Sequence, residues 1–228
     1  MNNRKPLTAV ILFCVFLLPM LIYIFLYTGT ETVFNGVPYA YHLSTSGDTV
    51  FHRVPAFSVE PVYEETALSA SDLKGYISII GFVSLEDDSM KKTTVLQGNL
   101  KRIYDNIIWD ADPPFRFVSI SWGDSLEALQ AYQARQDSDS TKWIYAMADT
   151  STVWNIAWEA FRLEEFRGRG PAVPPFTAQT IALLDKAGRV RKTYVATDLQ
   201  EERKIQEDLI ALLRLEYPED LPKIRAKR

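Results

Sequence analysis

Cysteine is almost absent from this sequence. Among 228 residues there is one, Cys14, and none follows it. Residues 15–228 therefore cannot form a disulfide among themselves, offer a thiolate nucleophile or bind a metal through sulfur. This absence removes thiol redox chemistry from the functions open to that part of the chain.

Histidine is nearly as rare, and basic charge is not in excess. The two histidines, His42 and His52, both precede the expected core, which favours ordinary surface or tether roles for them. A Ser-His-Asp arrangement stays open, although no Gly-x-Ser-x-Gly motif occurs. The net charge of −4 argues against a nucleic-acid partner, because such a binder would be expected to show a basic face.

Charged residues are missing from positions 6–30, and residues 7–27 are nearly all apolar. About 20 helical residues cross a hydrocarbon layer of ~30 Å. A cleaved signal peptide is the alternative, but its apolar region is normally about 7–15 residues long and ends in a small-residue cleavage site. Residues 27–30 form only a poor site, and Phe13 before Cys14 excludes a lipoprotein signal. We therefore expect an uncleaved transmembrane anchor at residues 7–27.

Positive charge lies on only one side of this apolar segment. Arg4 and Lys5 precede it, the nearest charge after it is Glu31, and the next Lys or Arg is Arg53. By the positive-inside rule, the tail of residues 1–6 lies in the cytoplasm and the following domain lies outside. The sequence thus predicts a single-pass protein of the cell (inner) membrane. We expect its domain to be periplasmic or otherwise extracytoplasmic, and its partner to be another membrane or periplasmic protein.

One domain is expected in the rest of the chain. We assign residues 28–52 to a tether with one short strand or hairpin, 53–217 to the domain and 218–228 to a basic, frayed C-terminal tail. Strands are predicted at 54–59, 76–83, 115–121 and 143–147, and helices at about 88–108, 124–135 and 151–161. A hairpin of 179–184 with 190–195 follows, and Thr197 or Asp198 caps a final helix.

This alternation of strands and helices predicts an α/β fold. We expect a mostly parallel central sheet with helices on both faces. A closing hairpin and a terminal helix after β-α-β units fit the thioredoxin-like class.

Five segments, in their order and spacing, resemble the Sco family (also called SenC/PrrC). Its members are thioredoxin-fold copper chaperones that help assemble cytochrome c oxidase, and they are typically tethered by one N-terminal helix. The resemblance covers roughly residues 52–216. The segments are VPAF at 54–57, IIGF at 79–82, RFVSIS at 116–121, LEALQAYQAR at 126–135 and TIALLDKAG at 180–188.

The residues that would give this family its chemistry are missing here. The resemblance implies a Cys-x-x-x-Cys loop after the second strand and a histidine before the hairpin, a ligand set that suits copper. In register, the two cysteines fall on Leu85 and Ser89, and the histidine falls near Gln179. We therefore expect three vestigial metal-site positions, with no bound metal, no cofactor and no catalytic residue.

Charged residues flank these vestigial positions. Acidic residues at 86–88 lie where a helix should begin, and there they also complement the helix dipole. A cage for a hard cation usually needs more carboxylates than this run supplies. The Gly/Pro-rich loop 167–175 carries two arginines, although a solvated loop rigidified by prolines explains it equally. Our candidate partner-docking residues are Leu85, Glu86, Asp87, Asp88, Arg167, Arg169 and Phe176.

The leading hypothesis is a redox-inactive, copper-ligand-free Sco-like domain that binds another protein or acts as an assembly factor. A role in respiratory oxidase biogenesis follows by analogy with the family. One alternative is an enzyme or metal carrier on the same fold that uses non-thiol ligands. Another is a structural subunit of an envelope complex. Converging carboxylates in a pocket would favour the enzyme or metal carrier, whereas a flat apolar or charge-complementary face would favour partner binding.

Overall fold

The computed structural model describes residues 17–20, 41–43, 49–63, 66–108, 114–172, 174–219 and 225–226. Apart from one helical turn at 17–20, the predicted anchor lies outside these residues, as do the predicted tail 1–6 and most of the tether. Within the described part, no helix combines the length and the apolar character needed to cross a bilayer. The elements described below belong to one compact unit, Gly36–Arg228.

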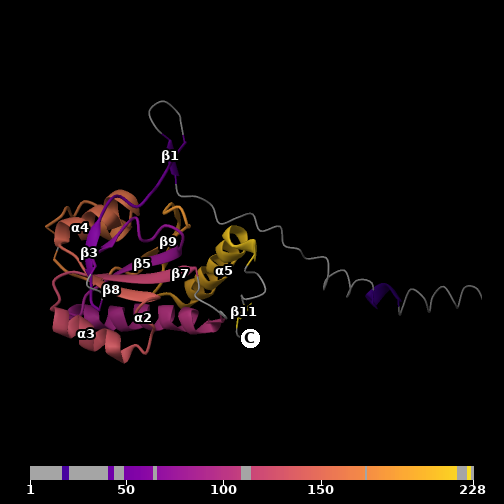
Figure 1. Cartoon of the computed structure of the whole chain (residues 1–228), viewed down its shortest axis with the longest axis horizontal. Coiled ribbons are helices and arrows are strands. Elements are labelled where there is room, and N and C mark those ends of the chain that lie inside the picture. The colour runs from indigo at the N-terminus through magenta and orange to yellow at the C-terminus, as the bar shows by residue number, and fades with distance from the viewer. Residues whose placement is uncertain are drawn as a thin grey trace, which may run out of the picture. The chain divides into compact units, whose positions relative to one another are not determined.

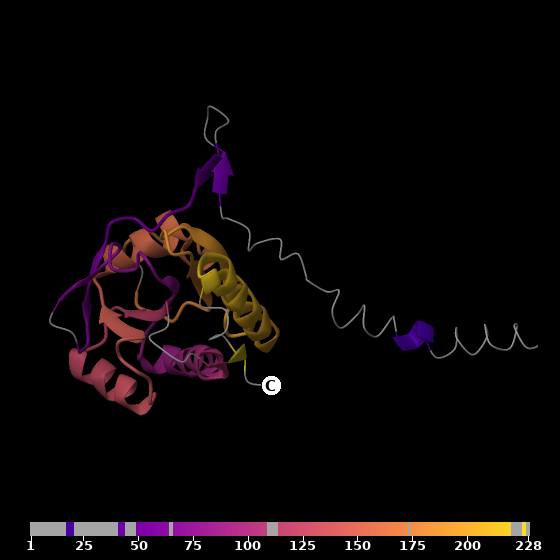
Figure 2. The ribbon, with the colours of Figure 1, turned by 45° about the vertical axis from the view of Figure 1, so that its right-hand side comes forward.

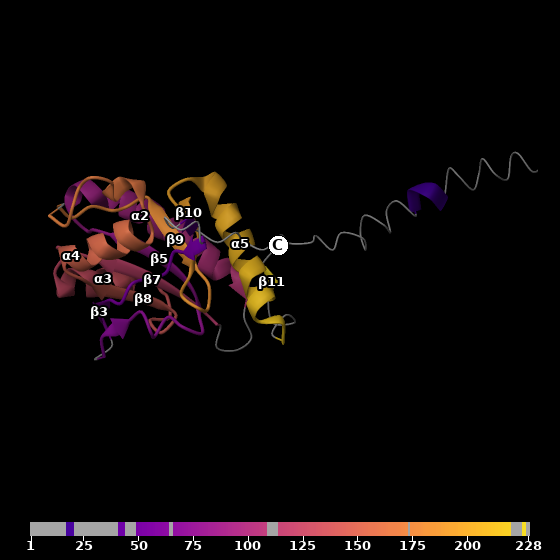
Figure 3. The ribbon, with the colours of Figure 1, turned by 90° about the horizontal axis from the view of Figure 1, so that it is seen from above.

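A seven-stranded sheet forms the centre of this unit, in the order β10-β9-β5-β7-β8-β3-β4. Seen from above, the strand labels from β10 to β3 follow that order (Figure 3). The strands are β3 Ser58–Pro61, β4 Leu68–Ser69, β5 Ile77–Val83, β7 Phe115–Ser121, β8 Trp143–Met147, β9 Thr180–Leu184 and β10 Val190–Val195.

The prediction of a mostly parallel sheet is wrong, because the sheet is mixed. Strand β7 pairs in parallel with β5 and with β8. The pairings β5–β9, β9–β10, β8–β3 and β3–β4 are antiparallel. Helices α2 Asp87–Asn106 and α3 Leu126–Arg135 connect β5 to β7 and β7 to β8, and crossovers of that kind are what parallel neighbours require. The first strands β3 and β4 and the closing hairpin of β9 and β10 add the antiparallel neighbours at the two edges.

Helices cover both faces of the sheet, as predicted. Apolar side chains of α2 Asp87–Asn106, α3 Leu126–Arg135 and α5 Leu199–Glu216 share one buried cluster with one face of the sheet. The other face packs on α4 Thr150–Trp154, its π-helical continuation Asn155–Ala160 and the 3-10 turn Glu164–Phe166. Helices α2 and α3 lie below the sheet and α4 above it (Figures 1 and 2). Because both faces are covered, every residue of β5 is buried.

Several element ends differ from the predicted ones. The first sheet strand is Ser58–Pro61, and the preceding residues instead lie against the β9–β10 turn, with the Val54 N–H donating to the Gly188 carbonyl at 3.2 Å. Helix α2 ends at Asn106, since Ile107–Ile108 forms β6 and pairs with β11, Arg225–Ala226. The segment assigned to a frayed tail therefore returns to the domain at this point. In the predicted tether, β1 Tyr41–Leu43 and β2 Thr49–Phe51 form a hairpin.

Candidate functional site

Three loops meet where β5 and β7 end and where β9 begins. They are residues 84–86 before α2, residues 122–125 before α3, and residues 174–179 before β9. The carboxyl ends of parallel strands are where α/β folds commonly place binding sites. The predicted positions Leu85, Ser89 and Phe176 all belong to this region, so the structure brings the first loop and the third loop together.

Asp124 fixes the first of these loops. Its carboxylate accepts the Leu85 N–H at 3.0 Å from both oxygens, and it also accepts the Ser121 hydroxyl. A charged acceptor makes such backbone hydrogen bonds stronger than neutral ones. Sequence reasoning missed this role, because it assigned Asp124 to the start of a helix, where Ser125 is the residue that caps α3. The available signal was an acidic residue placed directly after a buried strand and a glycine.

Below Leu85 lies a cluster of buried hydroxyl groups, formed by Ser84, Ser89, Thr93 and Thr177. The Thr93 hydroxyl donates to the Ser84 carbonyl at 2.6 Å and also contacts the Thr177 hydroxyl. The Ser84 N–H donates to Thr177 Oγ1 at 3.2 Å. The predicted position Ser89 is buried here, and its carbonyl lies 3.4 Å from Thr177 Oγ1. Hydrogen bonds between neutral groups therefore fill the space below the vestigial positions Leu85 and Ser89.

Thr177, and not Gln179, is the residue of the third loop that reaches Ser84 and Ser89. The Gln179 side chain accepts a hydrogen bond from the Thr197 hydroxyl at 3.2 Å, toward the start of α5. Its carbonyl accepts the Ala196 N–H at 2.8 Å. The contacts of Gln179 thus lie with Ala196 and Thr197, whereas those with Ser84 and Ser89 come from Thr177, two residues earlier in the chain.

The charged docking candidates do not pair with one another across the loops. Glu86 and Asp88 are exposed, and neither forms an ion pair with any described residue. Arg167 instead pairs with Glu164 at 3.1 Å on the open surface. The guanidinium of Arg169 lies 4.9 Å from the centre of the Phe176 ring. Asp87 is the first residue of α2, and its side chain is not among those that the structure describes.

Aromatic side chains pack against Phe176 in the third loop, residues 174–179. The half-buried Phe176 ring contacts Trp122 edge-on, with centroids 5.5 Å apart, and Phe166 at 5.0 Å. The adjacent Pro175 lies so close to Gly123 that a Cβ there would meet the Pro175 Cβ at 3.1 Å. The loop that carries Phe176 therefore packs directly on the loop that carries Asp124.

A second polar cluster joins α2, the helix that begins at the site, to the sheet. The Tyr145 hydroxyl donates to Gln97 Oε1 at 2.8 Å, and Trp143 Nε1 donates to the Ser119 hydroxyl at 3.0 Å. Gln97 Nε2 donates to the same hydroxyl at 3.1 Å. Burial raises the pKa of Tyr145, so its hydroxyl stays protonated and remains a donor. These bonds tie α2 to the central strands.

The residues at this site do not fit copper. Copper sites of the kind that the family resemblance implies use thiolate and imidazole ligands. Here the corresponding positions present the aliphatic Leu85, the buried Ser89, and the amide of Gln179, whose oxygen accepts the Thr197 hydroxyl. Across the part of the chain that the structure describes, no group of three or more His, Cys, Asp or Glu side chains is placed to hold a metal ion.

Proteins of known structure share this fold. BsSco, a member of the Sco family of cytochrome c oxidase assembly proteins, is 17% identical with a TM-score of 0.56, over 74% of this chain and 97% of BsSco. A SCO1/SenC family lipoprotein from Bacillus anthracis str. Ames is 16% identical with a TM-score of 0.55, over 72% and 96% of the two chains. A protein of Aquifex aeolicus VF5 with a proposed role in electron transfer is 14% identical with a TM-score of 0.55, over 74% and 95%.

The likeness is one of structure. The sequence matches no protein-family model. It also matches no curated protein sequence. At identities of 14 to 17%, the structural matches establish the fold alone. Sco/SenC family proteins are thus among the structural neighbours of this chain, which has the thioredoxin-like α/β fold that they share.

Proposed function

We propose that this chain is a membrane-anchored, Sco-like domain that acts by binding another protein, without copper or thiol chemistry. BsSco belongs to a family of oxidase assembly proteins, which supports an assembly role, in respiratory oxidase biogenesis, for this chain as well. The lipoprotein neighbour supports an extracytoplasmic, membrane-associated setting. Anchoring by residues 7–27, with the N-terminus in the cytoplasm and the domain in the periplasm, belongs to the same proposal.

The buried hydroxyl cluster is the observation that carries this proposal. Ser84, Thr93 and Thr177 form hydrogen bonds with one another and with the Ser84 carbonyl, so these polar groups inside the site are already paired. What stays available is the rim above the cluster. We define the docking rim as the seven candidate residues Leu85, Glu86, Asp87, Asp88, Arg167, Arg169 and Phe176.

The docking rim combines apolar anchors with charge. Leu85 and Phe176 are half-buried and pack against the core, so each presents apolar surface held in a fixed position. Glu86 and Asp88 lack ion-pair partners among the described residues, whereas Arg167 is compensated by Glu164. Exposed charge pairs contribute only about 0–1 kcal/mol each, so they orient a partner while the anchors hold it. We expect the partner to present a basic, partly apolar face.

Replacing Leu85 and Phe176 together with alanine should weaken partner capture about 10-fold or more, because hot-spot side chains contribute roughly 1–2 kcal/mol each. The partner is first identified by cross-linking from position 86 in unwashed membranes, and a wash with alkaline carbonate tests the anchor separately. Recovery of that partner is then compared between wild type and the double variant. Loss of the chain in the carbonate wash would contradict the anchor. The docking rim would then be tested by cross-linking the soluble fraction in the same way.

A matched control is available on α5. Leu199 and Leu215 are 67% and 58% exposed and do not belong to the docking rim, so replacing both with alanine should leave partner recovery unchanged. Both double variants must show the circular dichroism spectrum of the wild type. Wild-type recovery with the folded Leu85/Phe176 variant would place the docking surface elsewhere.

Copper should bind only weakly to this chain, since no residue after Cys14 is a cysteine and the vestigial positions present no imidazole. Titration with Cu(I) in the presence of a competing chelator measures the affinity, with a Cys14→Ser variant removing the one thiol. Stoichiometric binding that survives the chelator in that variant would instead support a metal carrier with non-thiol ligands.

A further inference from the structure

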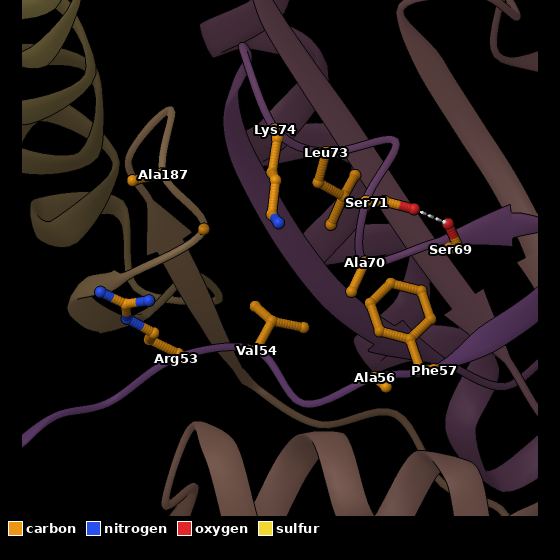
Figure 4. Close-up of a pocket in the computed structure, with 11 residues that line it drawn as sticks. Arg53, Val54, Ala56, Phe57, Ser69, Ala70, Ser71, Leu73, Lys74 and Ala187 are labelled. Atoms are coloured by element: carbon orange, nitrogen blue, oxygen red, sulfur yellow. Dashed lines mark hydrogen bonds between the residues drawn. The ribbon is translucent and has the colours of Figure 1, made fainter.

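A cavity of about 370 Å³ lies at the end of the sheet opposite to the docking rim. Its walls come from residues 53–57, the loop 69–74 that leads into β5, and the β9–β10 turn at 187–188 (Figure 4). Strand β5 begins beside this cavity and ends at the docking rim, which makes the two sites separate. The volume is at the lower end of the range of roughly 300–1,000 Å³ that is usual for small-molecule sites.

One part of the cavity wall is apolar and well packed. Phe57 and Leu73 are both buried and belong to the cluster under the second face of the sheet. Ala70 packs against the same cluster. These side chains offer an apolar or aromatic molecule a preformed surface, because their positions are already fixed by the core.

The other part of the wall is cationic. In Figure 4, Arg53 and Lys74 lie on the side toward Ala187, away from Phe57. Neither cation forms an ion pair with any residue that the structure describes. Such uncompensated cations beside an apolar wall favour a ligand that carries a negative charge.

Two acidic residues belong to the segments that line the cavity, and the carboxylates of both already have hydrogen-bond or ion-pair partners. The Asp72 carboxylate accepts the Ser69 N–H at 2.8 Å and the Ser69 hydroxyl at 2.6 Å. The Asp185 carboxylate pairs with Arg189 at 2.7 Å. Both carboxylates are thus held by hydrogen bonds or an ion pair of their own, and neither forms an ion pair with Arg53 or Lys74.

From this arrangement we infer that the cavity binds a small organic anion with a short apolar or aromatic body. Its carboxylate or phosphate head group contacts Arg53 and Lys74, and its body lies against Phe57 and Leu73. The Ala187–Gly188 turn forms a rigid wall beside the head group, since the Gly188 carbonyl is bonded to the Val54 N–H and the Gly188 N–H to the Asp185 carbonyl. This site is independent of the proposed docking function.

Binding is measured by fluorine NMR on the full-length chain in nanodiscs of zwitterionic lipid. The probes are 4-(trifluoromethyl)benzoate and 4-(trifluoromethyl)phenyl phosphate. The uncharged 4-(trifluoromethyl)benzamide removes the charge, and trifluoroacetate removes the aromatic body. We expect at least one of the two charged aromatic probes to bind about 10-fold more tightly than either control, because charge-assisted contacts and apolar burial must act together.

Two sets of variants localise the binding. Arg53→Gln with Lys74→Gln should weaken binding of the charged probe about 10-fold, and Ala70→Leu should weaken it by filling the apolar part. Lys91→Gln with Lys92→Gln removes two exposed lysines of α2, outside the cavity, and should leave the affinity unchanged. The inference is overturned if the uncharged benzamide binds as tightly as the charged probes. It is also overturned if the α2 variant weakens binding as much as the cavity variants do. Failure of both charged probes to bind the folded wild-type chain would overturn it too.

Discussion

Replacing Asp185 with alanine is expected to lower the free energy of unfolding by about 3–5 kcal/mol, because it leaves the buried Arg191 with Glu216 alone and removes the acceptor of the β9–β10 turn. Asp185 is fully buried, and its side chain accepts the N–H groups of Ala187 at 3.0 Å and of Arg189 at 2.9 Å. It also lies 3.6 Å from the guanidinium of Arg191, which is 3% exposed. The variant loses the β9–β10 turn bonds and the charge pairing in one step.

Urea unfolding followed by tryptophan fluorescence measures this loss. Asp185→Asn keeps the volume and one acceptor, so its loss should be intermediate. Lys101→Ala breaks the exposed ion pair with Asp105 and should change stability by no more than about 1 kcal/mol. A loss for Asp185→Ala as small as that of the exposed pair would show that the buried pairing contributes little.

Local sequence patterns were sufficient for the central strands. The predicted strands at 115–121 and 143–147 match β7 Phe115–Ser121 and β8 Trp143–Met147 at both ends. Both are runs rich in β-branched and aromatic residues that are buried between two layers. Strand direction did not follow from the pattern, because the pairings of β3 and β9 are decided by contacts between residues far apart in the chain.

The site was predictable to the extent that its residues follow strand ends. Leu85 and Ser89 lie in the loop and first turn after β5, as the resemblance implied. Thr177 was missed, because its partners Ser84 and Ser89 lie 93 and 88 residues earlier in the chain. Asp124 was missed because its partner is a backbone N–H 39 residues earlier, and no local pattern marks such a contact.

Gly123→Ala is expected to destabilise the domain by about 2–4 kcal/mol, because it adds a steric conflict to a backbone strain. Gly123 has a φ of +86°, which L-residues rarely adopt, and an added Cβ would meet Pro175 well inside van der Waals contact. Gly75 provides the matched control, since its φ of +84° is nearly the same and nothing lies within 4 Å of its Cβ position. Gly75→Ala should therefore cost only the backbone strain, about 1–2 kcal/mol.

The difference between the two glycine variants reports on the docking rim. Gly123 precedes Asp124, which holds the Leu85 N–H, and Pro175 precedes the anchor Phe176. Displacing Pro175 should therefore move one apolar anchor relative to the other, so Gly123→Ala should reduce recovery of the cross-linked partner at a temperature where the variant is still folded. Gly75→Ala should bind the partner as the wild type does. Equal losses of stability in the two variants would show that the loop around Pro175 yields freely, and a rigid rim could then not be the basis of partner binding.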